Sequence, residues 1–167
     1  MEDNNRRCIV VSEIMTPEKA NFAGNIHGGH IMKICDQVAY ACAARYSSSY
    51  VVTLSVDKIL FKQPIYVGDL VTFCATINYV GHTSMEVGIR VTAENLITKE
   101  LRHTNSCYFT MVAVDKNLKP KKVPPLKLKT PIEKRRFEEA AIRKEMNLKF
   151  QQEHQRRKAE LKSKFSD

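Results

Sequence analysis

The sequence predicts an α+β fold in which an antiparallel sheet wraps around one long central helix. Over residues 31–44, apolar side chains cover most of a helical surface, and Lys33, Asp36, Gln37 and Tyr40 form one narrow polar stripe. Several later segments alternate apolar and polar residues, as strands with one buried face do. A helix that is apolar nearly all round can bury its surface among such strands only if the sheet curls around it.

Composition favours one domain followed by a tail. The chain has 167 residues, of which 43% are hydrophobic and 27% charged, which is ordinary for a globular protein with a real core. No apolar stretch is long enough to span a bilayer, and the first seven residues lack the hydrophobic core of a signal peptide. We therefore expect a cytoplasmic protein that does not associate with membranes.

The cysteines indicate neither a disulfide framework nor a zinc site. They are odd in number, show no CxxC spacing and lie in apolar surroundings, so we expect reduced thiols in the core. The five are Cys8, Cys35, Cys42, Cys74 and Cys107.

The net charge of +9 lies entirely in the last third of the chain. Residues 1–114 hold ten basic and ten acidic residues, whereas residues 115–167 hold seventeen and eight. Such a tail could meet nucleic acid, an anionic membrane surface or a phosphorylated ligand. Because it has almost no aromatic residues for base stacking and no recognisable binding motif, we expect no nucleic-acid partner. We divide the chain into a domain at 1–126 and a basic linker and helix at 127–167.

The elements follow one another as strand, helix and four strands. Residues 8–15 form a first strand that ends at Thr16–Pro17, because proline lacks the ladder donor. The long helix ends before the serines at 47–49, and 51–57 alternates as a strand with a bulge expected near Lys58. Residues 61–69 form a turn-rich connection.

The four strands after the helix, beginning with 51–57, predict an antiparallel meander. A long strand begins at Leu70, and after a tight turn at 81–84 a second strand of the same period follows, so the two form a hairpin. Residues 101–114 supply a further strand, and 131–165 a charged helix. The core-facing side chains of the hairpin are Val71, Phe73, Ala75, Ile77 and Tyr79, then Met85, Val87, Ile89, Val91 and Ala93.

The start of the long helix is the first candidate site. Gly28 and Gly29 let the backbone approach another group closely, and the first N–H groups of a helix have no partner within it, so this end can bind a ligand oxygen. The same pattern is compatible with a core helix after a flexible turn, in which Asp36 is only a solvated charge near Lys33.

Five ordered blocks resemble the hotdog-fold acyl-CoA thioesterases, particularly the cytosolic acyl-CoA hydrolases. GNIHGG at 24–29 followed by Asp36 is similar to the family's catalytic motif, and FKQPIYVGD at 61–69 and VGHTS at 80–84 to its second and third blocks. FTMVAVD at 109–115 and VPPL at 123–126 complete a resemblance that covers about residues 8–126. The third block usually has arginine where this chain has His82.

The resemblance implies hydrolysis of a fatty acyl-CoA thioester to a free acid and coenzyme A, without metal or organic cofactor. Gly28 and Gly29 would supply N–H donors to the oxyanion at the positive end of the helix dipole. Asn25 would add a donor or position the water. Asp36 would act as general base or, in a rival mechanism, attack directly to give an anhydride.

The residues expected to bind substrate are more widely spread. His27 is better suited to hydrogen bonding at the helix start than to catalysis, and Thr53 faces a possible site from the following strand. Lys62 and the turn can meet the pantetheine amides or phosphates of coenzyme A through charge, backbone N–H groups and a hydroxyl. The turn residues are Gly81, His82, Thr83 and Ser84.

Assembly and two rival functions complete the expectations. The resemblance implies a homo-oligomer with a two-fold dimer as the unit and a trimer of dimers, a hexamer, as the larger state. One rival is a hotdog hydratase or dehydratase that uses His27 with Asp36 for proton transfer at carbon. The other is a non-enzymatic protein that binds coenzyme A or nucleic acid through the basic tail.

Overall fold

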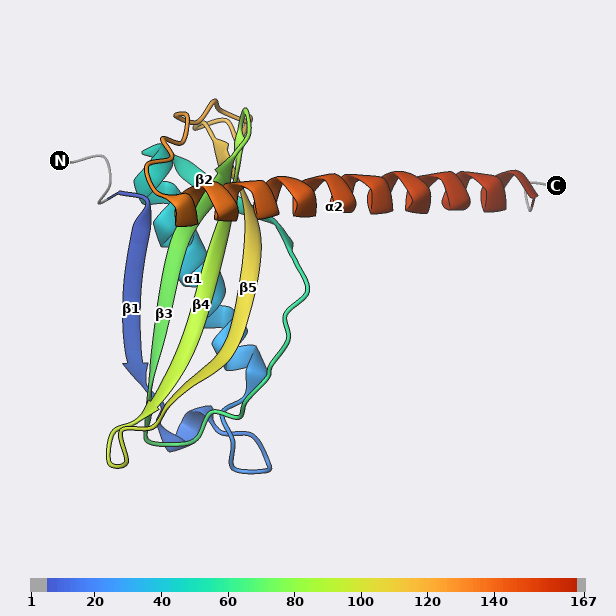
Figure 1. Ribbon diagram of the computed structural model, residues 1–167. Helices are drawn as coiled ribbons and strands as arrows, with labels where there is room; N and C mark the ends of the chain where they lie inside the picture. The colour runs from blue at the N-terminus through green and yellow to red at the C-terminus, as the bar shows by residue number, and fades with distance from the viewer. Residues whose placement is uncertain (1–5, 165–167) are drawn as a thin grey trace. The chain divides into compact units, whose positions relative to one another are not determined.

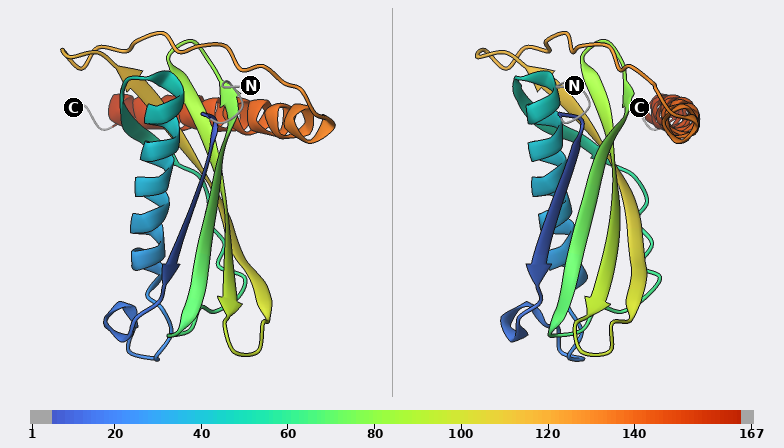
Figure 2. Two further views of the ribbon diagram at one scale, coloured as in Figure 1. Left: turned by 90° about the vertical axis from the view of Figure 1, so that its left-hand side faces the viewer. Right: turned by 60° about the vertical axis from the view of Figure 1, so that its left-hand side comes forward.

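The computed structural model describes residues 6–164, and the chain divides into two compact units, Met1–Leu126 and Lys127–Asp167. The first unit is a five-stranded antiparallel sheet in the order β1-β3-β4-β5-β2, with α1 against one face (Figures 1 and 2). This α+β arrangement confirms the predicted fold class. Its elements are β1 (Cys8–Ile14), a short 3-10 helix (Pro17–Lys19), α1 (Gly28–Ser47), β2 (Tyr50–Val56), β3 (Asp69–Val80), β4 (Ser84–Asn95) and β5 (Leu101–Val114).

The core lies between α1 and the inner face of the sheet. α1 contacts all five strands, and its buried side chains are small or slender, which allows the sheet to approach closely. The alternation predicted for β4 is confirmed, since each of its apolar residues is buried. The core side chains from α1 are Ile31, Ile34, Cys35, Val38, Ala39, Cys42 and Ala43.

Three details of the strands differ from the prediction. The four strands after the helix do not form one meander, because β2 pairs with β5 at the sheet edge and β3 lies between β1 and β4. The register of β3 and β4 shifts between Ile77 and Tyr79, so Asn78 is buried and Tyr79, which we expected in the core, is only half-buried. The bulge expected near Lys58 lies earlier, because the register of β2 and β5 shifts between Thr53 and Ser55. The alternation of apolar and polar residues shows which residues share a face of the strand, but it does not show where the pairing of two strands shifts by a residue.

The shift in β3 is stabilised by polar packing on the outer face of the sheet. The Asn78 side-chain amide donates to Glu86, 3.2 Å away, and both side chains are buried. Gly88 makes room for them, because a Cβ there would lie 2.2 Å from the Asn78 amide nitrogen.

Cysteine burial is only partly as expected. Cys35, Cys42 and Cys107 are buried, but Cys8 and Cys74 are exposed on the outer face of neighbouring strands. Burial raises the pKa of the Cys42 thiol to about 12. A hydrogen bond with Cys107, together with burial, raises the pKa of Cys35. The Cys35 and Cys42 thiols are therefore protonated and unreactive at neutral pH.

The second unit contains α2 (Pro131–Lys164), a charged helix as predicted. A reciprocal pair caps its start: the Glu133 N–H donates to Thr130 Oγ1, and the Thr130 N–H donates to the Glu133 carboxylate. Arg156 and Arg157 both donate to Glu153 and lower the pKa of that carboxyl to about 2. Within residues 6–164, neither α1 nor α2 has an apolar run suited to crossing a membrane.

Core packing leads to a first prediction. Ile89 is 2% exposed in the centre of β4, whereas Ile97 is 90% exposed in the turn after that strand. Ile89→Ala should lower the free energy of unfolding by about 2–5 kcal/mol, because it removes buried methyl groups and leaves a cavity. Ile97→Ala, the matched control, should change it by less than about 0.5 kcal/mol. Urea unfolding at fixed protein concentration measures both, and equal losses would contradict this assignment of the core.

Candidate active site

Asp36 lies on the one exposed stripe of α1, among buried neighbours. Its carboxylate accepts a hydrogen bond of 2.7 Å from Thr53 Oγ1 on β2. Thr53 also contacts the Met111 sulfur at 3.6 Å, so β2 and β5 both fix its side chain. The hydroxyl bonds to one carboxylate oxygen and holds the carboxylate in one orientation, with Asp36 still open to the surface.

A cavity of about 350 Å³ contains this pair. Tyr40, one turn after Asp36, meets Tyr50 edge to face with ring centroids 6.0 Å apart. The cavity therefore joins a fixed carboxylate to an apolar aromatic wall, as ligand sites commonly do. Its lining residues are Asp36, Gln37, Tyr40, Tyr50, Val51, Val52 and Thr53. We did not predict the tyrosines as site residues, although the position of Tyr40 on the polar stripe was a usable signal.

At the start of α1, only one of the two backbone N–H groups that we predicted to bind a substrate oxygen is free. His27 is the N-cap residue, and its Nδ1 accepts the Gly29 N–H at 3.0 Å. His27 therefore has the hydrogen-bonding role favoured by the sequence. Its bond also engages the Gly29 N–H, one of the two N–H groups predicted to bind the oxyanion. Within residues 6–164 the Gly28 N–H has no acceptor. A Cβ on Gly28 would lie 3.4 Å from the Phe61 ring, so that ring packs closely over the helix start.

A buried ion pair braces the segment before the helix. Arg102 donates to the Asp69 carboxylate at 2.5 Å and to the Pro64 carbonyl at 2.8 Å, and its guanidinium carbon lies 4.7 Å from the centre of the Tyr66 ring. Asp69 also accepts the Tyr66 N–H at 2.9 Å. This network holds the loop that contains Ile65, and the Ile65 carbonyl accepts the Ile26 N–H at 2.8 Å. The network therefore sets where Gly28 lies.

Two asparagines shape the loop that leads to the helix. Asn25 forms an isolated antiparallel bridge with Tyr66. Asn21 Oδ1 accepts the N–H groups of Ala23 at 2.9 Å and Asn25 at 3.2 Å, as asparagine does in tight turns. We predicted Asn25 as a site residue and did not consider Asn21.

Two of the predicted substrate-binding elements, Lys62 and the turn at 81–84, lie at opposite ends of α1. Lys62 follows Phe61 near the helix start, and its N–H donates to the Thr104 carbonyl at 2.8 Å. The turn at 81–84 lies at the other end of the unit, where Thr83 O accepts the Ala113 N–H at 2.9 Å and His82 O accepts the Val123 N–H at 3.0 Å.

Asp36 lies between these two ends. It follows Gly28 by eight residues, or about 12 Å along the helix axis. One protomer therefore does not gather Gly28, Asp36 and the turn into a single site.

Comparison with known proteins identifies the family. The model of the thioesterase superfamily matches residues 23–99. Protein VdlD of Helicobacter pylori is 52% identical over 84% of this chain and 80% of its own length. A Zymomonas mobilis protein named as an uncharacterized acyl-CoA thioester hydrolase is 35% identical over 68% of this chain and 76% of its own length. The chain belongs to the acyl-CoA thioester hydrolases of the thioesterase superfamily.

Solved structures of this family have the same fold. An apo-hexameric acyl-CoA thioesterase is 38% identical, with a TM-score of 0.84 over 87% of this chain and 93% of its own. The acyl-CoA hydrolase of Staphylococcus aureus, solved with butyryl coenzyme A, coenzyme A and coenzyme A disulfide, is 27% identical, with a TM-score of 0.85 over 94% and 96%. The S. aureus enzyme has also been solved as three alanine variants, in which an asparagine, an aspartate and a threonine are replaced.

The hydrogen bond from Thr53 to Asp36 generates a prediction for this thioesterase. Thr53→Val keeps the shape of the side chain but removes the donor, so kcat for an acyl-CoA should fall by roughly 10- to 100-fold while the fold is retained. Ser55→Ala, on the same strand past the register shift, is the control and should stay within about twofold of wild type. Steady-state release of free thiol measures kcat, and a fully active Thr53→Val variant would show that the carboxylate does not need this donor.

Proposed function

We propose that the protein hydrolyses fatty acyl-CoA thioesters to a free acid and coenzyme A, with Asp36 as the acting carboxylate. The observation that carries the proposal is the Asp36–Thr53 hydrogen bond of 2.7 Å on the exposed stripe of an otherwise buried helix. The relatives named as acyl-CoA thioester hydrolases support the reaction class.

The chemistry follows from the positions of the groups. Asp36 takes a proton from water as the oxygen attacks the thioester carbonyl, and the Gly28 N–H at the positive end of the helix dipole stabilises the oxyanion. The carbon–sulfur bond then breaks, and the proton passes to the coenzyme A thiolate. In the rival route the Asp36 carboxylate attacks first, and water cleaves the resulting anhydride. Both routes use groups of the protein and water alone, with no metal or organic cofactor.

A rival hydratase or dehydratase function is less well supported. It would require His27 to move protons at carbon, yet Nδ1 of His27 accepts the Gly29 N–H at 3.0 Å and caps the helix. Nucleic-acid binding has little physical support as well, because many basic side chains of α2 pair with acidic residues on the same helix, including Arg135 with Glu139 and Lys149 with Glu145. We also propose a cytoplasmic location, supported by a mouse relative named as a cytosolic hydrolase, 34% identical, of which this chain spans about a third.

The active site is proposed to form between two subunits. Gly28 and Asp36 of one chain are about 12 Å apart along the axis, yet both must come within roughly 3–4 Å of one thioester carbon. In a two-fold dimer with antiparallel helices, the start of one α1 lies beside Asp36 of the other, and symmetry creates two equal sites. A trimer of such dimers gives the proposed hexamer, and related thioesterases described as hexameric support it.

The asparagine of this site is either Asn25, which the motif suggested, or Asn21. In the S. aureus enzyme, the replaced aspartate follows the replaced asparagine by fifteen positions, and the replaced threonine follows the aspartate by seventeen. Asp36 and Thr53 are separated by 17 here, and the asparagine fifteen residues before Asp36 is Asn21. This spacing favours Asn21.

The first test of the proposal is a substrate panel. The wild-type enzyme should release free thiol from acyl-CoAs of several chain lengths, with and without a chelator, and Asp36→Ala should lower kcat by about 10³-fold or more, because it removes the base. Asp57→Ala, which removes a carboxylate just beyond β2, is the matched control. Undiminished turnover in Asp36→Ala would overturn the proposed role of this residue, and loss of turnover with chelator would overturn the metal-free mechanism.

The second test is subunit mixing. Asn21→Ala and Asp36→Ala should each be strongly impaired alone, but a mixed dimer contains one intact site and one doubly damaged site. Random mixing makes about half the dimers mixed, so specific activity should recover to about one quarter of wild type by this symmetry. Asn25→Ala in place of Asn21→Ala separates the two candidates. If subunits exchange and neither pair recovers activity above its parents, the shared-site proposal is wrong.

A further inference from the structure

The loop before α1 carries a phenyl ring that its own subunit leaves uncovered. Phe22 is 113% exposed, so nothing within residues 6–164 packs over its side chain. The backbone around it is held in place, because the Asn21 N–H donates to the Asn25 carbonyl at 2.6 Å and the Gly24 N–H donates to the Asn21 carbonyl at 3.0 Å. An apolar ring held out in this way can leave water only against another molecule.

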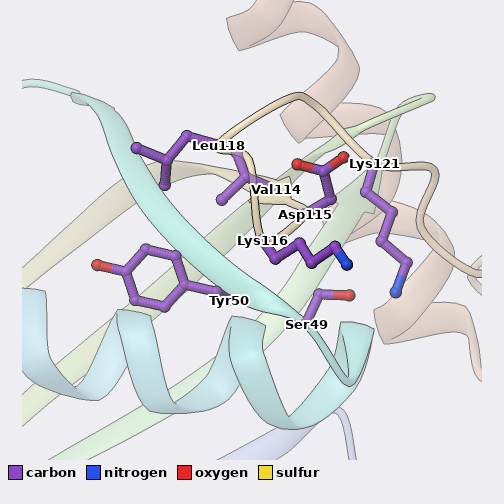
Figure 3. Close-up of a pocket in the computed structure, with 7 residues that line it drawn as sticks. All are labelled: Ser49, Tyr50, Val114, Asp115, Lys116, Leu118 and Lys121. Atoms are coloured by element: carbon purple, nitrogen blue, oxygen red, sulfur yellow. The ribbon is translucent and has the colours of Figure 1, made fainter.

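The aromatic wall of the cavity beside Asp36 is also uncovered in one subunit. Tyr40 and Tyr50 line that cavity of about 350 Å³, yet they are 41% and 56% exposed. Tyr50 also lines a second cavity of about 600 Å³, and Figure 3 shows its ring extending along α1 away from Ser49. Both tyrosines therefore leave apolar ring surface free beside the carboxylate.

The proposed dimer brings these two uncovered surfaces together. Its helices run in opposite directions, with Gly28 of one subunit beside Asp36 of the other. In that other subunit, Tyr40 follows Asp36 by four residues, or about 6 Å along the axis. The loop at 20–27 lies beyond the N-terminal end of α1 (Figures 1 and 2), and in the antiparallel pair this is the direction from Asp36 toward Tyr40. Phe22 of one subunit therefore reaches the tyrosine pair of the other.

We propose that Phe22 forms the outer wall of the site in the other subunit and packs on the substrate chain that flanks the thioester. The chain lies between this ring and the rings of Tyr40 and Tyr50, which together give it an aromatic surface on both sides. The proposal rests on the proposed function, since it assumes a thioester at Asp36 and a site shared by two subunits. Asn21, the asparagine favoured for that site, directly precedes Phe22, so one loop supplies both side chains. Phe22 contributes affinity and takes no part in bond breaking.

The first measurement compares kcat and KM of single variants. Phe22→Ala should lower kcat/KM for an acyl-CoA by at least tenfold, mainly through KM, because burial of a phenylalanine ring contributes roughly tenfold or more in affinity. Phe22→Leu, which keeps an apolar side chain, should recover to within about threefold of wild type. Phe150→Ala is the matched control, because it removes the same ring from a position that is 74% exposed on α2, and it should change kcat/KM by less than about twofold.

Two acyl lengths identify which part of the substrate the ring contacts. With butyryl-CoA and dodecanoyl-CoA as substrates, a loss in kcat/KM that grows with acyl length assigns Phe22 to the acyl chain. An equal loss for both assigns it to the pantetheine arm, which the two substrates share. Either pattern supports an apolar contact with a chain beside the thioester.

Subunit mixing tests whether the ring acts across the interface. Phe22→Ala is mixed with a large excess of inactive Asp36→Ala, so nearly every subunit that retains Asp36 is paired with one that retains Phe22. KM should then return to the wild-type value. If subunits exchange and KM stays at the value of Phe22→Ala, the ring serves the site of its own subunit and the proposal is wrong.

Other results would also overturn the role of Phe22. Unchanged kinetics in the folded Phe22→Ala variant would do so, as would an equal effect of Phe150→Ala. A loss that disappears at high protein concentration would do the same, because it would reflect dissociation of the dimer.

Failure of this inference can be told apart from failure of the proposed function. A wild-type protein that hydrolyses no acyl-CoA would overturn both. Normal wild-type turnover, with activity recovered when Asn21→Ala and Asp36→Ala are mixed but with unchanged kinetics in Phe22→Ala, would overturn the role of Phe22 alone.

Discussion

Burial of α1 against the inner face of the sheet is the constraint on which the site depends. Ile31, Cys35, Ala39 and Cys42 are at most 1% exposed, and together they fix how the helix is rotated about its axis. With this rotation Asp36 faces the edge strand β2 and meets Thr53. A rotation by one residue would turn the carboxylate into an apolar core, where an unpaired charge is strongly unfavourable. The apolar surface of the helix therefore positions Asp36, the one carboxylate of α1.

The start of α1 is positioned by polar contacts instead. The ion pair between Arg102 and Asp69 holds the loop before β3, and that loop holds Ile26 through the Ile65 carbonyl. His27 then closes the first turn by accepting the Gly29 N–H. Because the first two of these contacts join segments distant in the chain, the position of the free Gly28 N–H depends on the folded domain and not on local sequence alone. Such preorganised donors need little rearrangement when charge develops on a substrate oxygen.

The basic excess of the chain divides into two chemically different parts. In α2, several arginines and lysines pair with glutamates three or four residues away, as exposed helices commonly do. Lys116 and Lys121 lie instead in the cavity beside the end of α1. Net charge alone did not distinguish these two environments.

The sequence by itself determined the architecture and most of the chemistry. The apolar surface of residues 31–44 predicted α1, and alternation predicted the strands, because burial on one face imposes a period that is visible in the residues. The blocks around Gly28 and Asp36 indicated thioesterase chemistry, and Thr53 was among the predicted site residues. The fold follows from residue type and short-range spacing, whereas the thioesterase chemistry was indicated by resemblance to a known family.

Only the tertiary structure decided which groups meet. The contact of Asp36 with Thr53 depends on β2 packing beside α1, and the register shifts at Asn78 and Leu54 depend on the partner strands. The segment around Phe61 and Lys62 and the turn at 81–84 lie toward opposite ends of the helix (Figure 1), while Tyr50 lines two cavities formed by segments far apart in the chain. The physical reason is that the spacing of apolar residues shows which side of a helix or strand is buried. Which distant segments pair with one another is set by the packing of the whole domain.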